Sequence, residues 1–216
     1  MGSWLLPLMA SVISLVFAIE VSRQYLRRRR AYQFWWTVSL ILYTFAAFAE
    51  FLAAFRGSWS PSLYTLYYIS AAALVGFMGG GTVFLIGGRR VGHVFILVMA
   101  AATVAMAAVA ASVGVNTAAL AGGRVVAGQA MPNTVRLLAM LLTIPGSLAL
   151  FGGAAYSWWK TRHHFNLLIA LGTLIISGAG GAARLGRPEF LYLGEMLGLA
   201  VLFAGFLLSR EVPRRS

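Results

Sequence analysis

The sequence predicts an all-α integral membrane protein, folded as one bundle of seven transmembrane helices over residues 1–216. The chain is 60% hydrophobic and only 10% charged, with a mean hydropathy of +0.83. A soluble domain of this length needs more charge on its surface. Seven apolar stretches fill most of the chain, and each approaches the roughly 20 helical residues that a bilayer requires. Two of these stretches carry a glutamate inside the hydrocarbon zone, Glu50 and Glu195.

The predicted spans lie between basic or turn-forming residues. We place them at about 4–21, 34–55, 63–86, 91–113, 135–158, 165–182 and 190–209. The first span has no basic segment before it and no small-residue cleavage site after it, so we expect a retained helix. The one long connection, 114–134, is rich in Gly and Ala and contains Pro132. We expect it to be exposed and mobile.

Basic residues predict the orientation, because cytoplasmic loops carry an excess of Lys and Arg. Five of the 17 fall on one side of the predicted membrane: Arg56, Arg124, Arg136, Arg184 and Arg187. The other twelve fall on the opposite side: Arg23, Arg27 to Arg30, Arg89, Arg90, Lys160, Arg162, Arg210, Arg214 and Arg215. We therefore expect a multi-pass protein of the cell (inner) membrane, with its N-terminus outside and its C-terminus cytoplasmic.

Small residues predict close helix packing. Gly76 and Gly80, and also Gly194 and Gly198, have the four-residue spacing that lets helix backbones approach one another in lipid. The run of small residues at 100–108 predicts a helix surrounded by other helices.

Glu50 and Glu195 are the candidate functional residues. Each lies five or six residues from the outer end of its span, which is roughly 8 to 9 Å below the boundary at 1.5 Å per residue. An acid at that depth is costly unless it is paired, protonated or hydrated. Tyr43, Ala46, Ala47 and Glu50 share one helix face, so we expect Glu50 to point inward.

The two acids are expected to line one outward-facing cavity. Tyr192 lies on the face of Glu195, while Tyr67 and Tyr68 would form a wall, and Arg136 and Arg184 a rim. Three interpretations remain open. Each acid is neutralised by an arginine or hydrogen-bonded to a tyrosine, or the pair binds a proton or cation, or the cavity recognises an organic ligand.

Other classes of site are disfavoured. The chain has no cysteine, so thiolate chemistry is excluded. It has no lysine in its last span for a retinal Schiff base and no facing histidines for haem. Two carboxylates alone make a poor metal site. We expect no catalytic residue, cofactor or metal, and the basic clusters indicate anionic lipid headgroups rather than nucleic acid as partners.

The segment Arg27 to Arg90 resembles the N-terminal seven-helix sensor region of bacterial histidine kinases and cyclases. The resemblance rests on the basic run at 27–30, on Phe34-Trp35-Trp36, on the segment 46–52, on Tyr67-Tyr68 and on Arg89-Arg90. It covers less than a third of the chain, and no kinase or cyclase domain follows Arg215. The resemblance implies a detached sensor or a relative with another function.

The leading functional hypothesis is a small prokaryotic transporter that moves a small solute, ion or proton with Glu50 and Glu195. The alternative is a receptor-like sensor that binds a small or lipophilic ligand in the same cavity. A membrane-embedded lipid-modifying enzyme ranks third. A homo-oligomer is compatible with each of these hypotheses.

Overall fold

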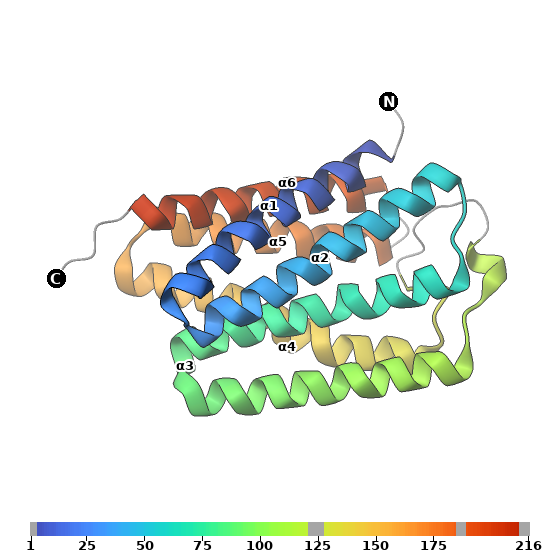
Figure 1. Ribbon diagram of the computed structural model, residues 1–216, viewed down its shortest axis with the longest axis horizontal. Coiled ribbons are helices and arrows are strands. Elements are labelled where there is room, and N and C mark those ends of the chain that lie inside the picture. The colour runs from blue at the N-terminus through green and yellow to red at the C-terminus, as the bar shows by residue number, and fades with distance from the viewer. Residues whose placement is uncertain (1–3, 121–127, 185–188, 212–216) are drawn as a thin grey trace.

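The computed structural model describes residues 4–120, 128–184 and 189–211, which fold into six α-helices and one short 3₁₀ helix without any strand (Figure 1). The helices lie side by side along the long axis of the molecule. Their bounds are α1 Leu5–Arg28, α2 Ala31–Arg56, α3 Pro61–Val113, the 3₁₀ helix η1 Thr117–Leu120, α4 Asn133–Thr161, α5 His164–Arg184 and α6 Glu189–Glu211.

The predicted all-α fold is confirmed for the described residues. All six helices are long and apolar enough to cross a membrane, which indicates a multi-pass membrane protein. Most of the helices extend several residues beyond the predicted spans. The apolar runs locate the bilayer-spanning part, whereas the polar first and last turns of each helix carry no such signal.

The described residues contain six helices rather than the seven that we predicted, because the predicted spans 63–86 and 91–113 belong to the single helix α3. Within α3, Gly88 has non-helical angles (φ 79°, ψ −178°). That combination is essentially restricted to glycine. The chain doubles back there, so that the two halves of α3 lie side by side (Figure 1). A Cβ built on Gly80 would meet Ile96, and one built on Gly92 would meet Phe84.

The helices pack in chain order. Each of the helices α1 to α5 contacts the helix that follows it in the chain, and α1 also contacts α6. Gly76 and Gly80 face neighbouring helical segments as predicted, since a Cβ on Gly76 would lie 3.1 Å from Met99 and 3.3 Å from Leu142. Gly79 also lies against the backbone of α4. Its Cβ would lie 2.5 Å from the carbonyl oxygen of Gly146.

The second half of α3 is peripheral, so the prediction that residues 100–108 are surrounded by other helices is wrong. Val104 in this run is 69% exposed and Leu97 just before it is 68% exposed, whereas Met106 is fully buried. Lipid is as apolar as a helix surface, so a run of small residues allows close packing without requiring a neighbour on every side.

The connection between α3 and α4 packs partly onto the bundle where it is described, which corrects the prediction that all of it is exposed. Leu120, Ala130 and Met131 are buried. The backbone N–H of Asn116 donates to the carbonyl of Ala130 at 3.0 Å, which ties the two ends of the connection together. Residues 121–127 lie outside the described residues.

Candidate functional site

A cavity of about 440 Å³ lies between α2, α3, α4, α5 and α6 and contains both predicted acids. We call it the acid cavity. Its lining includes Glu50, Glu195, Tyr43, Tyr67, Tyr68, Leu74, Thr143, Ile144, Ser147, Leu148, Ser177, Gly180, Gly181 and Leu191, together with Gly128 of the α3–α4 connection. The volume is within the range of roughly 300 to 1,000 Å³ that is usual for small-molecule sites.

Glu50 is held at the inner face of α2 by the small-residue stripe that the sequence predicted. Tyr43, Ala46, Ala47 and Ala53 of that stripe are all buried, and Glu50 itself is only 1% exposed. The bulky side chains on the other side of α2 face outward, as Phe48 shows with 43% exposure. Alanines near Glu50 let the neighbouring helices approach closely, which removes the acid from the lipid.

Neither carboxylate oxygen of Glu50 has a hydrogen-bond partner of standard geometry among the described residues. The polar side chains that come close to it are those of Tyr67 and Glu195. A buried polar group without a partner costs roughly 1 to 3 kcal/mol. Glu50 is therefore aimed into the cavity, where Tyr67 and Glu195 are its polar neighbours but neither makes a hydrogen bond of standard geometry with it.

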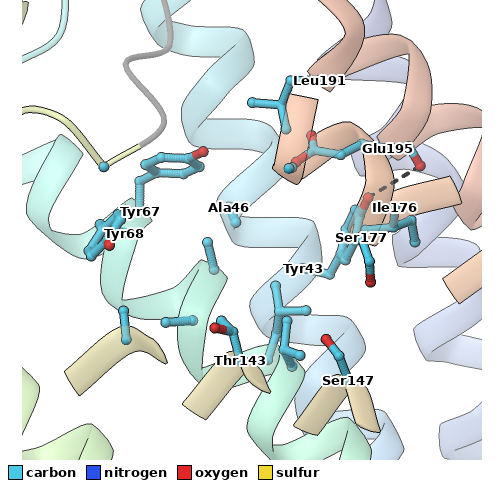
Figure 2. Close-up of a pocket in the computed structure, with 18 of the residues that line it drawn as sticks. Tyr43, Ala46, Tyr67, Tyr68, Thr143, Ser147, Ile176, Ser177, Leu191 and Glu195 are labelled. Carbon is cyan, nitrogen blue, oxygen red and sulfur yellow. Dashed lines mark hydrogen bonds between the residues drawn. The ribbon is translucent and has the colours of Figure 1, made fainter. Parts of the chain in front are cut away.

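Glu195 reaches the same cavity from α6 and is half-buried. The hydroxyl of Tyr43 donates to its backbone carbonyl at 3.3 Å, which joins α2 to α6 beside the two acids. In Figure 2 the Tyr67 ring and the Glu195 side chain extend toward one another across the cavity from α3 and α6. A Cβ on Gly198, one turn further along α6, would lie 2.8 Å from the carbonyl oxygen of Gly172, so α6 also packs tightly on α5.

Aromatic side chains form the wall of the cavity on the α3 side. The Tyr67 ring packs on Trp59 with centroids 5.0 Å apart, and Tyr64 stacks on Tyr68 at 6.3 Å. Trp59 is 5% exposed, so it belongs to this cluster rather than to the membrane interface. Gly128 (φ 82°) covers Tyr68, because a Cβ there would lie 2.9 Å from the ring. The α3–α4 connection thus closes one end of the aromatic wall.

Two of the predicted site residues, Tyr192 and Arg136, do not line the cavity, and the side chain of a third, Arg184, is not described. Tyr192 is half-buried but does not line the cavity, and Leu191, four residues before Glu195, takes that position. Arg136 donates to the Oδ1 atom of Asn133 at 3.4 Å instead of entering the cavity. Arg184 ends α5, and its side chain lies outside the described residues.

The α4 and α5 walls of the cavity were missed from the sequence. Thr143 and Ser147 come from α4, and Ser177, Gly180 and Gly181 come from α5. The i, i+4 spacing of Thr143 and Ser147 would have indicated a polar face on an otherwise apolar helix. Isolated hydroxyls in such a helix are usually satisfied by their own backbone, which hides that signal.

The described lining contains no arginine, lysine or histidine, so no basic side chain there balances the two acids. Nor does any group of three metal-ligating side chains occur in the described parts of the chain. His93 instead packs edge-on against Phe84, and its Nδ1 lies 2.7 Å from the carbonyl oxygen of Arg89. The acid cavity therefore offers two carboxyl groups, hydroxyls and aromatic faces to whatever enters it.

A second cavity, of about 500 Å³, lies toward the other end of the bundle. We call it the basic-end cavity. Its lining includes Arg27, Arg28, Gln24, Tyr32, Trp36, Thr82, Leu150, Gly153, Ser157 and Asn166. The end of α1, the bend of α3 and the junction of α4 with α5 all lie at this end (Figure 1).

A thin packed layer, which we call the waist, separates the two cavities. Seven positions separate Tyr43 in the acid cavity from Trp36 in the basic-end cavity, and seven residues of helix rise by about 10 Å. The waist contains Leu40, Met78 and Leu199, all buried, together with the close contact of Gly79 with Gly146.

Comparisons with protein-family models, with curated protein sequences and with solved structures give no match to this chain.

Proposed function

We propose that this protein moves a small solute or ion across a cell membrane, with Glu50 and Glu195 binding the transported species or its coupling proton. The observation that carries the proposal is the convergence of two acids from different helices in one cavity whose described lining has no basic side chain. An acid at membrane depth is costly to keep. An arginine counter-charge, which would explain both glutamates by folding alone, is not found among the described lining residues.

The basic-end cavity favours transport over sensing. A sensor needs one ligand cavity, whereas a transporter must expose its site to each side of the membrane in turn. Here two cavities lie in the same bundle, the second toward its basic end, and along α2 they are separated by roughly 10 Å. A modest rearrangement at the waist would transfer access from one side to the other.

We further propose seven membrane crossings, with the N-terminus outside and the C-terminus in the cytoplasm. The chain reversal at Gly88 divides α3 into two segments that would each cross the bilayer. With this orientation the basic ends of α1 and α4 and the bend of α3 face the cytoplasm of a bacterial inner membrane. The acid cavity then lies nearer the outer surface.

Cysteine accessibility tests the orientation directly, because the chain has no native cysteine. Thr117 in η1 and His164 at the start of α5 are both exposed and lie at opposite ends of the bundle. In intact cells, Thr117→Cys should react with an impermeant maleimide, and His164→Cys should react only after the membrane is permeabilised. The reverse pattern would mean that the orientation is inverted.

Flux in proteoliposomes tests the transport function. Purified protein is reconstituted with a pH-sensitive dye inside, and a proton or sodium gradient is imposed. Glu50→Gln and Glu195→Gln keep the side-chain shape but cannot ionise, so each should reduce flux at least tenfold. Glu20→Gln is the matched control, because Glu20 pairs with Arg23 at 2.9 Å on α1, away from the acid cavity. Equal flux in all four proteins and in empty vesicles would contradict the proposal for these ions.

Anionic lipid is the proposed partner at the cytoplasmic end. Arg27 and Arg28 are exposed and also line the basic-end cavity, so their guanidinium groups can contact lipid headgroups there. Juxtamembrane basic residues gain roughly 1 kcal/mol each from an anionic leaflet.

A further inference from the structure

We propose that the acid cavity binds a small lipophilic organic cation, which enters sideways from the bilayer between α4 and α5. The inference deepens the proposed function, since it names the substrate class of the same two acids. It requires three features of the cavity: a negative deep end, an aromatic and apolar lining, and an opening at the level of the acyl chains.

The deep end of the cavity selects positive charge. Glu50 is 1% exposed, and neither of its carboxyl oxygens has a hydrogen bond of standard geometry among the described residues. Glu195 approaches it from α6. A bound cation would place its charge between the two carboxylates and supply the missing partner of Glu50. An anionic ligand would be repelled from this position.

The aromatic wall selects an organic cation over a bare metal ion. Tyr67 and Tyr68 line the cavity beside the acids, and Trp59 supports the Tyr67 ring from behind. Tyrosine faces attract ammonium groups by cation–π interaction, which is strongest for cations that shed their water easily. Hard metal ions instead require six or more oxygen ligands. Two carboxylates and an apolar lining fit a cation with an apolar body.

The opening of the cavity lies between α4 and α5. Ile144 and Leu148 both line the cavity, yet they are 55% and 67% exposed, so they stand at its mouth. On the opposite side Ser177 is exposed, and Gly180 and Gly181 have nothing within 4 Å of a built Cβ. The contact of α4 with α5 is also sparser than that of α3 with α4. These residues lie far from both ends of α4, so the mouth faces lipid tails rather than water.

The depth gradient inside the cavity matches an amphiphilic ligand. Ile144 and Leu148 at the mouth are exposed, Thr143 and Ser147 of α4 are half-buried, and Tyr43, Tyr67 and Glu50 are buried. The apolar body of a ligand that partitions into the bilayer can therefore contact the aliphatic side chains at the mouth, while its cationic group binds the acids inside.

A matched pair of probes tests the charge selectivity on the unmodified protein. Phenyltrimethylammonium is the cation, and tert-butylbenzene is its neutral analogue of the same shape. In nanodiscs of purified full-length protein, the cation should bind one per chain and at least tenfold more tightly than the neutral analogue. Equal affinity of the two probes, or no binding of the cation, would overturn the proposal.

Two acid variants locate the binding site. Glu50→Gln and Glu195→Gln should each weaken cation binding at least tenfold without changing binding of the neutral analogue, while Glu20→Gln should leave both unchanged. If Glu50→Gln fails to fold, the half-buried Glu195 provides the second variant. Wild-type cation affinity in folded Glu50→Gln and Glu195→Gln would overturn the assignment.

A bulky residue at the mouth tests lateral entry. Gly180→Trp places a large side chain in open space beside the opening, and Gly152→Trp does the same on α4 at a position that does not line the cavity. Stopped-flow association of phenyltrimethylammonium should slow at least tenfold in Gly180→Trp and not in Gly152→Trp. Equal association rates would overturn entry between α4 and α5.

The outcomes separate this inference from the transport proposal. If the cation binds with the expected charge selectivity but is not taken up by proteoliposomes, the binding site is supported and the transport proposal is contradicted. The sensor interpretation then remains. If protons or sodium are transported but the organic cation does not bind, the transport proposal is supported and the organic-cation site is contradicted.

Discussion

Replacing Glu50 by an apolar residue should stabilise the protein, because neither of its carboxyl oxygens has a hydrogen bond of standard geometry among the described residues. Glu50→Leu replaces this buried carboxyl group by an apolar side chain of similar size. An unsatisfied buried polar group costs about 1 to 3 kcal/mol, and replacing it by a well-packed apolar group recovers that cost. We therefore expect the free energy of unfolding to rise by about 1 to 3 kcal/mol.

The measurement is equilibrium unfolding in mixed micelles, read by tryptophan fluorescence. For a chain of this length a gain of 1 kcal/mol corresponds to roughly 2 to 4 °C in melting temperature. Glu195→Leu is the matched comparison: its half-buried carboxylate has access to the cavity, so its gain should be smaller. Loss of flux together with increased stability would identify Glu50 as a residue kept for function.

The opposite result would refute this reasoning. If Glu50 is a structural counter-charge, its removal strands a buried arginine, and the free energy of unfolding falls by about 3 to 5 kcal/mol. A destabilised Glu50→Leu would therefore mean that a basic partner reaches the acid and that the cavity is held together by it.

Two glycine substitutions test the packing. Gly79→Leu should abolish folding or lower the melting temperature strongly, because a Cβ there would lie 2.5 Å from the α4 backbone. The control Leu66→Ala, at a 54% exposed position of the same helix, should change the melting temperature little. Equally small effects of both substitutions would mean that α3 and α4 are apart at Gly79. Gly88→Ala should cost about 1 to 3 kcal/mol, since φ 79° with ψ −178° suits only glycine. Gly57→Ala should lower the free energy of unfolding by less, because Gly57 has φ 72° in the ordinary left-handed region. A larger loss in Gly57→Ala than in Gly88→Ala would contradict the chain reversal at Gly88.

The sequence carried enough information to place Glu50 but not to place its surroundings. The orientation of Glu50 follows from a helical stripe of alanines on α2, a local pattern with a period of 3.6 residues. Tyr192 was assigned to the cavity from the same kind of pattern, and Leu191 occupies that position instead. On a helix, residues three and four positions before Glu195 share its face equally well, so the tilt of α6 decides between them.

The outer cap and the mouth of the cavity depend on long-range packing. Gly128 covers Tyr68 from a connection whose composition predicts only an exposed loop. Ser177 and Gly180 line the mouth because α5 lies apart from α4 at that level. In lipid, apolar residues are favourable on every face of a helix, so hydropathy does not distinguish a surface that faces a neighbour from one that faces acyl chains.

α4 is the helix that connects the two cavities. On α4 the lining residues Leu148 and Leu150 are only two positions apart although they belong to different cavities, whereas seven positions separate Val75 from Thr82 on α3. Pro145 lies inside α4 directly before Gly146, the residue whose backbone touches Gly79. Proline removes one backbone hydrogen bond, so α4 can bend there more easily than its neighbours. Movement of α4 against α3 would therefore join the cavities.

Locking α3 to α4 should stop transport while the acid cavity still binds its ligand. A Cβ built on Gly153 lies 3.7 Å from the Cβ of Thr82, which is within the range for a disulfide, and both residues line the basic-end cavity. The double variant Thr82→Cys/Gly153→Cys starts from a cysteine-free chain, so only the engineered pair can oxidise. Oxidised protein should lose at least tenfold in proteoliposome flux and recover it with a reductant, with binding of phenyltrimethylammonium unchanged. The single variants control for the substitutions themselves. Undiminished flux through the cross-linked protein would show that α3 and α4 do not move apart at the basic-end cavity during transport.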